Sequence, residues 1–326
     1  MSRNDTQQGL ALPIVDLDGL ALEGPLNRFV AASLDTAFRS TGFCYVANTG
    51  VSNTSIERIF AASKEFHALD RSAKDRIAIN AFHRGYMAPK SSLIQTSSVA
   101  KVTRPNLSES FMAMHEVAES SPRFGLPLQG PNQWPGELPE LRQSVLAYLD
   151  EMTVFARRFT ALLAVALGLS AEHFDRHFTH PTIWLRLLHY PPQPVDMPHD
   201  QFGSAPHTDY GFLTLLAQDE NGGLEVRDRS GQWLPAQPLP GTFIVNVADM
   251  LARMTNNRWP STPHRVRNLT GKDRYSVPFF WDTNMDSQIA CLDRFASDAE
   301  QAPDPVIFGH YVMERLDRNY AYRKHG

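Results

Sequence analysis

The chain has 326 residues, of which 42% are hydrophobic and 20% are charged, and its formal net charge is -4 at pH 7. This is the composition of a globular protein with a sizeable core, and the weak negative charge favours neither nucleic acid nor an acidic membrane as a partner. The two cysteines, Cys44 and Cys291, imply no disulfide framework, so a cytoplasmic location is expected. The polar N-terminus and the lack of a run of about 18 apolar residues predict neither a signal peptide nor a membrane span.

The first part of the chain alternates short apolar runs with segments of helical spacing. Residues 1–10 are polar and are predicted to be disordered. Residues 12–17 and 42–46 are apolar and predict two strands. Over 26–40 and 51–66, apolar residues recur every three or four positions, which predicts two amphipathic helices. The chain is therefore expected to open with the order strand, helix, strand, helix.

Residues 139–167 carry the strongest helical pattern in the chain. A continuous apolar stripe runs along this segment, and Gly168 suits the end of a helix. Beyond residue 182, short strand-like runs are separated by turns, which favours an antiparallel sandwich or a jelly roll. A last helix is expected over 308–320.

These elements predict an α+β fold, with a double-stranded β-helix (jelly-roll) core and flanking α-helices. After the disordered residues 1–10, we expect a mostly helical region over 11–181 that packs on the core. The jelly-roll catalytic core is predicted over 182–295 and the C-terminal helix within 296–326. The long helix needs a wide apolar surface to cover, and the predicted sheet supplies one, so these parts are expected to form one integrated catalytic domain.

Two histidines and an aspartate form the first chemical pattern. In an extended strand, residues i and i+2 point to the same side, so His207 and Asp209 project together while Thr208 faces away. His264 supplies a second imidazole further along the chain. Two imidazoles and one carboxylate suit a divalent transition metal and leave coordination positions open, as in non-haem iron(II) sites.

A second pattern follows on the apolar run 274–280. Arg274 and Ser276 repeat the i, i+2 geometry there. A guanidinium charge on such a strand is costly unless an anion pairs with it. A guanidinium beside a hydroxyl suits a carboxylate, which it holds by a two-pronged, charge-assisted contact. The sequence therefore predicts a carboxylate-binding pair as well as a metal site.

The two patterns resemble the isopenicillin N synthase-like branch of the 2-oxoglutarate and iron(II)-dependent oxygenases, which includes plant flavonoid, gibberellin and alkaloid oxidases. The resemblance implies that His207, Asp209 and His264 hold the iron. It is carried by several short runs in the second half of the chain: 189–192, 205–209, 222–226, 246–249, 255–256, 261–266 and 274–280.

The resemblance also implies a binding site for 2-oxoglutarate. Arg274 and Ser276 would grip its far carboxylate, and Tyr190 would help to bind the same group. The chain departs from the plant pattern in this part of the sequence. Leu188 stands where many members have Asn, and Ala248 replaces the usual Gly.

The activity implied by the resemblance is the oxidation of a small molecule, by hydroxylation, desaturation or ring formation, in specialised metabolism. Fe(II) is the implied cofactor, 2-oxoglutarate the co-substrate and O2 the oxidant. A small-molecule substrate is the implied partner, and a monomer or a weak homo-oligomer is expected.

A long polar loop and several aromatic and basic residues are candidates for substrate contact. The loop covers residues 90–105 and is expected to be a mobile lid, because loops longer than about 12–15 residues tend to be functional or disordered. The alternative is a solvated surface loop without a role. The candidate substrate contacts are Arg84, Tyr86, Lys101, Arg104, Phe280 and Trp281.

Other functions are compatible with parts of this pattern. An oxidase of the isopenicillin N synthase type needs no 2-oxoglutarate, and an ethylene-forming type of enzyme shares the same scaffold. Two histidines and an aspartate can also hold zinc in a hydrolase, although a carboxylate clamp has no evident purpose there. A metal-free binding protein on the same scaffold is the remaining alternative.

Overall fold

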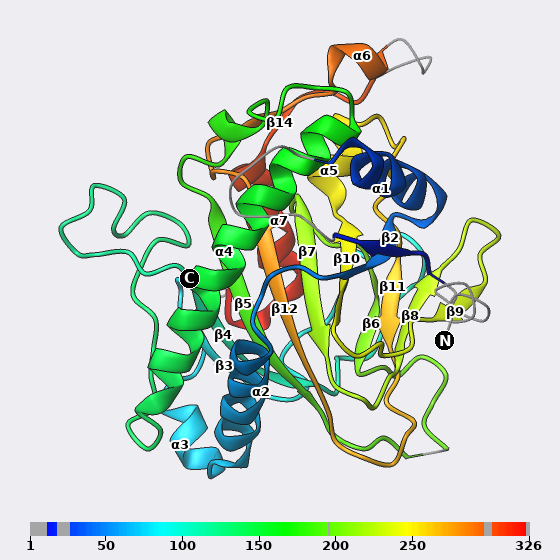
Figure 1. The fold of residues 1–326 in the computed structure, drawn as a ribbon. Coiled ribbons are helices and arrows are strands. Elements are labelled where there is room, and N and C mark those ends of the chain that lie inside the picture. Colours follow the sequence, from blue (N-terminus) through cyan, green and yellow to red (C-terminus); the bar gives the residue numbers. More distant parts are fainter. Residues whose placement is uncertain (1–11, 18–26, 195, 297–301, 324–326) are drawn as a thin grey trace.

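The computed structural model describes residues 12–17, 27–194, 196–296 and 302–323. The segment 1–10, predicted to be disordered, lies outside the described residues. Strands form a central pair of sheets, and helices lie on the outside of this pair (Figure 1).

The larger sheet has eight strands in the order β1, β2, β10, β7, β12, β5, β4, β3. Only β1 and β2 pair in parallel; the other neighbours within this sheet are antiparallel. The bounds of the strands, in sheet order, are Ile14–Asp16, Phe43–Ala47, Thr242–Val247, Leu213–Gln218, Arg274–Asp282, Thr182–Tyr190, Glu109–Met114 and Gly85–Met87.

A smaller sheet of four strands packs against one face of the larger sheet. Its order is β6, β11, β8, β9, with the bounds Ser204–His207, His264–Val266, Leu224–Arg227 and Trp233–Pro235. Buried side chains of both sheets share one apolar cluster, which includes Tyr45, Leu188, Leu224 and Val266. The two sheets therefore enclose an interior, as expected for a jelly roll. Strands β13 (Gln288–Ile289) and β14 (Val306–Ile307) form a separate pair.

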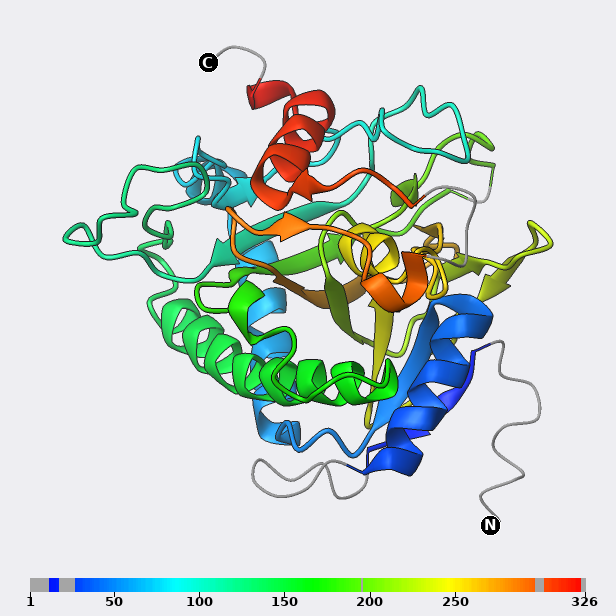
Figure 2. The same ribbon diagram turned by 90° about the horizontal axis from the view of Figure 1, so that it is seen from above.

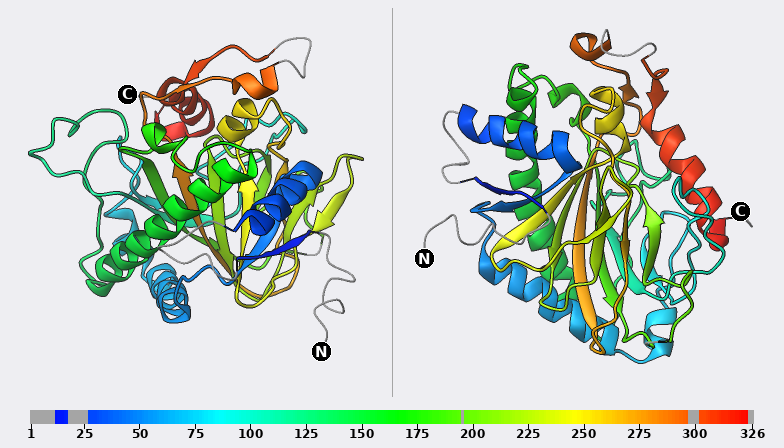
Figure 3. Two further views of the ribbon diagram at one scale, coloured as in Figure 1. Left: turned by 45° about the horizontal axis from the view of Figure 1, so that its top comes forward. Right: turned by 90° about the vertical axis from the view of Figure 1, so that its right-hand side faces the viewer.

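Three helices cover the outer face of the larger sheet (Figures 1 and 3). They are α1 (Arg28–Thr41), α2 (Asn53–Ala68) and α4 (Glu140–Ala166). The buried stripe of α4 packs into the same apolar core as the outward-facing side chains of β12. Just beyond α4, Gly168 has φ +69°, a conformation that glycine adopts at little cost and that suits the end of a helix.

A fourth long helix, α7 (Phe308–Asn319), lies on the opposite side of the larger sheet (Figures 2 and 3). Within the described ranges, no helix is long and apolar enough to cross a membrane. The shorter helical elements are α3 (Arg71–Asp75), α5 (Asp249–Met254), α6 (Asp293–Ala296) and the 3-10 turns Asp175–His177 and Ala321–Arg323.

The alternation of side chains along β12 determines which residues reach the interior. Val277, Phe279 and Trp281 are buried in the core formed with the outer helices. The residues of opposite parity, from Arg274 to Asp282, face the enclosed interior. Strand β12 has nine residues and is buried on both faces. Its side chains on one face belong to the apolar core, and those on the other face include the polar residues of the interior.

The predicted fold class is confirmed, and the four predicted long helices lie within two residues of their expected ends where the structure describes them. The larger sheet, however, crosses the boundary predicted at residue 181, because β1–β4 from the preceding region complete both of its edges. The strands β3 and β4 are short and buried throughout, so they show no alternation in the sequence. The proposed division into segments stays a prediction.

Candidate metal centre and its cavity

The predicted metal ligands converge at one end of the smaller sheet. His207 ends β6 and His264 begins β11, and the two residues are direct partners in the antiparallel pairing. The Nε2 atom of each histidine lies 3.7 Å from Oδ1 of Asp209. Among the described residues, this is the one group of three metal-binding side chains with ligand atoms within 4.8 Å of one another.

Backbone carbonyls orient both imidazole rings. Nδ1 of His207 lies 2.7 Å from the carbonyl oxygen of Ala205, and Nδ1 of His264 lies 3.3 Å from that of Thr262. Because a carbonyl only accepts hydrogen bonds, Nδ1 carries the proton in both rings and Nε2 is left as the metal ligand. Burial, followed by the neighbouring charge of His264, lowers the pKa of His207 to about 4, so this ring is neutral near pH 7.

The carboxylate of Asp209 is oriented by two side chains from neighbouring strands. Its Oδ2 atom accepts hydrogen bonds from Thr214 Oγ1 at 2.5 Å and from Asn246 Nδ2 at 2.8 Å. The other oxygen, Oδ1, is the one that faces the two imidazoles. Such outer partners fix a ligand in its binding geometry and raise metal affinity.

We expect Thr214→Val to weaken iron binding by about 10- to 100-fold, because valine keeps the size of the side chain but cannot donate to Oδ2 of Asp209. The affinity is measured by anaerobic titration with Fe(II). Thr153→Val is the matched control, since Thr153 donates only to a carbonyl of its own helix α4. Equal iron affinity in Thr214→Val and the control would contradict the role of Thr214.

The turn after Asp209 is held against β12. Oδ1 of Asp282 accepts the backbone N–H of Phe212 at 2.8 Å, and the carbonyl of Asp209 accepts the N–H of Asp249 at 2.9 Å. Any Cβ atom at Gly211 would overlap the carboxylate of Asp282. Glycine is therefore required for this close approach, which aims the aspartate ligand.

Arg274 is fully buried on the same interior side as the metal ligands. Its guanidinium donates to Ser276 Oγ and to Gln218 Oε1, each at 3.3 Å, and lies 4.7 Å from the centre of the Tyr190 ring. Its Nε atom is buried without a hydrogen-bond partner, and no carboxylate in the described part of the chain pairs with it. A buried charge in this state is costly, so the residues fit an anionic ligand such as one carboxylate of 2-oxoglutarate.

A cavity of about 100 Å³ adjoins the three metal ligands. Strands β5, β6 and β12 form its walls, and α7 and the segment 92–106 close it. The residues that line it are His83, Ser92, Ile94, Asn106, Met112, Trp184, Arg186, Ser204, His207, Thr208, Asp209, Tyr210, Gly211, Phe280, Asp282, Val312, Leu316, Asn319 and Tyr320.

Of the predicted substrate contacts, only Phe280 lines this cavity. Trp281 has the opposite parity on β12 and donates from Nε1 to Thr160 of α4. Tyr86 faces the outer helices, where its hydroxyl bonds to Glu109. The alternation of side chains along a strand therefore directs both residues away from the cavity.

The predicted basic contacts also lie away from the cavity. Arg84 is fully buried, and its guanidinium donates to the carbonyls of Phe82, Leu128 and His115, so it serves the backbone of a loop. Lys101 is exposed, and Arg104 pairs with the exposed Asp200 at 2.9 Å. None of these three residues lines the cavity in the structure.

The predicted lid, 90–105, has two different halves. Its first half is tied to the end of α7, because the N–H groups of Gln95 and Thr96 donate to Oδ1 of Asn319. Thr96 also bonds to the hydroxyl of Tyr210, beside the metal ligand Asp209. The second half is mostly exposed. The movement of this loop stays a prediction.

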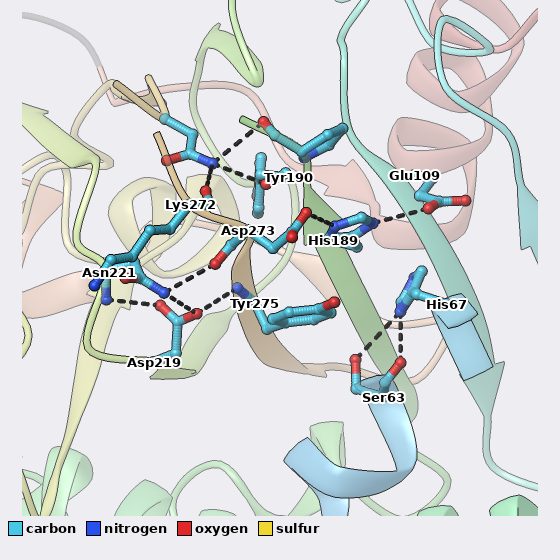
Figure 4. Close-up of polar contacts among 12 residues, drawn as sticks. Ser63, His67, Glu109, His189, Tyr190, Asp219, Asn221, Lys272, Asp273 and Tyr275 are labelled. Carbon is cyan, nitrogen blue, oxygen red and sulfur yellow. Dashed lines mark hydrogen bonds and ion pairs between the residues drawn. The ribbon is translucent and has the colours of Figure 1, made fainter. Parts of the chain in front are cut away.

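Arg274, Ser276 and Tyr190 are called the clamp below. A polar network lies behind the clamp, on the outer face of the larger sheet (Figure 4). His189 lies between two carboxylates: its Nδ1 is 2.8 Å from Glu109 and its Nε2 is 2.7 Å from Asp273. Its ring stacks on Tyr275, with centres 4.8 Å apart. Since carboxylates accept and do not donate, both ring nitrogens must carry protons, and His189 is an imidazolium.

The pKa values of this network follow from the same contacts. Burial alone would lower the pKa of His189, but its hydrogen bonds to Glu109 and then Asp273 raise it above the usual value. Burial alone would raise the pKa of Glu109, but hydrogen bonds from His189, Tyr86 and Lys74 lower it to about 2. The network ties the residues next to Tyr190 and Arg274 together, and thereby supports the clamp.

The network predicts a specific pH dependence of stability. The contribution of His189 is complete below its ordinary pKa of 6.5 and is lost as the pH rises through its higher folded pKa. The contribution of Glu109 is complete above 4.5 and is lost as the pH falls through about 2. We therefore expect His189→Gln to lower the free energy of unfolding by about 1.5–3 kcal/mol near pH 6, and by less near pH 9, as measured by urea denaturation.

The exposed His199 provides the matched control for that experiment. His199→Gln is expected to change the free energy of unfolding by less than about 0.5 kcal/mol at either pH. A loss of stability in His189→Gln that is the same at both pH values would contradict an imidazolium between the carboxylates.

The sequence interpretation missed several residues of the cavity, of which Arg186 and His83 carry the most chemistry. Arg186 is a charge within the apolar strand β5 and shares the parity of Tyr190, a signal that could have identified it. His83 is fully buried, and burial followed by the charge of Arg186 holds its pKa well below the usual value. Nothing in the local sequence of His83 indicates its position.

Known proteins share both the fold and the site. Residues 182–283 match the model of the 2OG-Fe(II) oxygenase superfamily, and residues 12–137 match that of the non-haem dioxygenase in morphine synthesis N-terminal region. The chain is 34% identical over 307 residues to a 2-oxoglutarate-Fe(II) type oxidoreductase of Emericella nidulans. The matched residues cover 91% of this chain and 86% of that protein.

Two further relatives cover nearly the whole chain. Clavatol oxidase of Penicillium crustosum is 36% identical over 330 residues, which are 95% of this chain and 97% of that protein. The crystal structure of a full-length Neurospora crassa protein in complex with alpha-KG and thymine has a TM-score of 0.82 at 28% identity, over 96% of this chain and 98% of that chain.

A two-sheet roll that carries two histidines and an aspartate at one end defines the class of non-haem iron oxygenases. The chain belongs to the 2OG-Fe(II) oxygenase superfamily, in its isopenicillin N synthase-like family. It is an Fe(II)- and 2-oxoglutarate-dependent dioxygenase, with His207, Asp209 and His264 as the iron ligands. The family membership argues against two alternatives that the sequence left open, a zinc hydrolase and a metal-free binding protein.

Proposed function

We propose that this dioxygenase oxidises a C–H bond of a small molecule bound in the cavity beside the iron ligands, with 2-oxoglutarate held by Arg274, Ser276 and Tyr190. The observation that carries the proposal is the buried guanidinium of Arg274, which faces the interior and pairs with no carboxylate among the described residues. Oxygen would supply the oxidising equivalents and bound Fe(II) would activate it, while 2-oxoglutarate would be oxidised in the same turnover and leave as succinate and carbon dioxide.

Each residue of the clamp has a separate task in this proposal. Arg274 offers the charge and the planar fork that suit a carboxylate. Ser276 accepts from Nη1 of Arg274 and can donate its own proton to the bound carboxylate. The ring of Tyr190 lies over the guanidinium and holds its plane in position.

The remaining walls of the cavity orient the substrate and exclude water. Phe280 and Trp184 are neighbours across β12 and β5 and offer aromatic surface. Val312 and Leu316 of α7 add aliphatic surface on the opposite side. A cavity that combines aromatic and aliphatic surface with polar side chains is suited to one small molecule, which it holds in one orientation.

The comparisons support a small-molecule substrate. One relative is named for the oxidation of clavatol, another as a homoarginine-6-hydroxylase, and the Neurospora crassa structure contains thymine. By analogy we propose a role in small-molecule, specialised metabolism. The cytoplasmic location and the monomeric or weakly homo-oligomeric state stay predictions from the sequence.

A substrate screen tests the proposal. The enzyme is incubated with Fe(II), 2-oxoglutarate, oxygen and candidate small molecules, and both succinate and oxidised product are quantified. A true substrate is expected to give one succinate for each product molecule. Product formed without 2-oxoglutarate would favour an oxidase of the isopenicillin N synthase type, and product accompanied by ethylene would favour the ethylene-forming type.

A further inference from the structure

Arg186 places a second guanidinium in the interior, separate from that of Arg274. It lies on β5, on the same face as Trp184, Leu188 and Tyr190, and lines the cavity beside the iron ligands. Its pairing partner on β4 is Met112, and its Nε atom donates to Ser110 Oγ at 2.8 Å. The side chain is therefore held toward β4, and its Nε–H is used within the protein.

The two Nη atoms of Arg186 have no hydrogen bond and no ion pair with any residue that the structure describes. Two carboxylates line the same cavity, and neither pairs with it. Asp209 faces the two metal-binding imidazoles, and Asp282 accepts the N–H of Phe212. His83 is neutral because burial and nearby charges lower its pKa. The guanidinium of Arg186 therefore has no carboxylate partner among the described residues of the cavity wall.

We propose that Arg186 binds a carboxylate group of the substrate, so that this dioxygenase acts on small carboxylic acids whose apolar body packs between Phe280 and α7. The proposal rests on the proposed function, because it assigns the substrate class of the same cavity. A guanidinium without a carboxylate partner in a cavity wall is costly in the free enzyme, and an acidic substrate lowers that cost when it binds.

The geometry of Arg186 favours a carboxylate over a neutral acceptor. With Nε–H already bound to Ser110, the side chain offers its Nη atoms, which can donate two parallel hydrogen bonds to the two oxygens of one carboxylate. Such a fork also fixes the direction of the acid relative to the iron ligands. Arg186 would then decide which C–H bond of the substrate is presented for oxidation.

Anaerobic calorimetry on the enzyme loaded with Fe(II) and 2-oxoglutarate tests the proposal. The probes are benzoate and phenylacetate, each with its primary amide, together with phenylphosphonate. The wild type is expected to bind at least one of the two carboxylates more tightly than its amide. Arg186→Met is expected to lower that affinity by about 10- to 100-fold, since the methionine keeps the length of the side chain but not the charge.

Two controls separate this role from structural effects. Arg104→Met removes an arginine that pairs with Asp200 at the surface, and it is expected to leave probe binding unchanged. Arg186→Lys keeps the charge without the fork, and it is expected to give an intermediate affinity for the carboxylate. The melting temperature of each variant reports on folding; if Arg186→Met is unstable, Arg186→Lys carries the comparison.

Several results would overturn the proposal. They are equal binding of acids and amides by the wild type, tighter binding of phenylphosphonate than of both carboxylates, or carboxylate binding that is unaffected in Arg186→Met and Arg186→Lys. A loss of 2-oxoglutarate affinity in Arg186→Met would show instead that Arg186 serves the co-substrate. Failure of the proposed clamp would be recognised by a different result. In that case a variant of Arg274 would bind 2-oxoglutarate as tightly as the wild type does.

Discussion

Replacing Asp209 by alanine is expected to reduce oxygen-dependent turnover by more than about 100-fold while the chain stays folded. Loss of an outer partner of a metal ligand costs about 10- to 100-fold, and loss of the ligand itself must cost more. Oδ1 of Asp209 lies 3.7 Å from each imidazole Nε2 atom, and among the described residues this group of possible ligands contains no further side chain. His207→Ala and His264→Ala are expected to behave in the same way.

The measurement is succinate release together with the iron content of protein purified and loaded without oxygen. Asp286→Ala is the matched control, because Asp286 is exposed and lies outside the site. It should retain both turnover and iron. Full turnover by Asp209→Ala without an added ligand would rule out the assignment of the metal centre.

The second large effect is expected at the clamp. Arg274→Lys keeps the charge but loses the fork that faces Ser276 and Gln218, so the Kd for 2-oxoglutarate should rise by at least about 10-fold. Ser276→Ala removes one contact to a charged group, worth about 1.5–3 kcal/mol. In both variants the iron affinity should stay at the wild-type value, since neither residue is a metal ligand.

The exposed Arg104 again supplies the control for Arg274→Lys, because it forms only a surface ion pair. Arg104→Lys should not change the Kd for 2-oxoglutarate, measured anaerobically by calorimetry. If Arg274→Lys and Ser276→Ala also left that Kd unchanged, the co-substrate would have to bind elsewhere.

The parts of the site that could be predicted from sequence depend on short-range geometry. His207 and Asp209 are two residues apart, and so are Arg274 and Ser276, so the alternation of an extended chain determines which side chains lie together. The pairing of His264 with His207 was implied by a family resemblance and not by spacing. Here the structure supplies the contact directly.

The same alternation separates the two aromatic residues Phe280 and Trp281 on β12. Trp281 has odd parity relative to Arg274, so it had to face the outer helices, where it bonds to Thr160. By the same argument, Arg186 has the parity of Tyr190 and had to face the interior. Each outcome follows from counting residues along its own strand, β12 for Trp281 and β5 for Arg186.

Other features depend on contacts between segments that are distant in the sequence. His189 meets Glu109 and Asp273, which are 80 and 84 residues away along the chain. The strand β4 joins the edge of the sheet through its pairing with β5, which no local pattern indicates. Such contacts are set by the packing of the whole domain, so sequence patterns alone could not predict them.

Anaerobic calorimetric titration of the purified protein with 2-oxoglutarate, in the presence and absence of Fe(II), tests the central claim most directly. The account predicts that one 2-oxoglutarate binds per chain, that Fe(II) tightens this binding, and that Asp209→Ala removes the effect of Fe(II). It also predicts that Arg274→Lys weakens the binding whether or not Fe(II) is present. Binding of 2-oxoglutarate that is indifferent to Fe(II), to Asp209 and to Arg274 would contradict the assignment of the iron and co-substrate site.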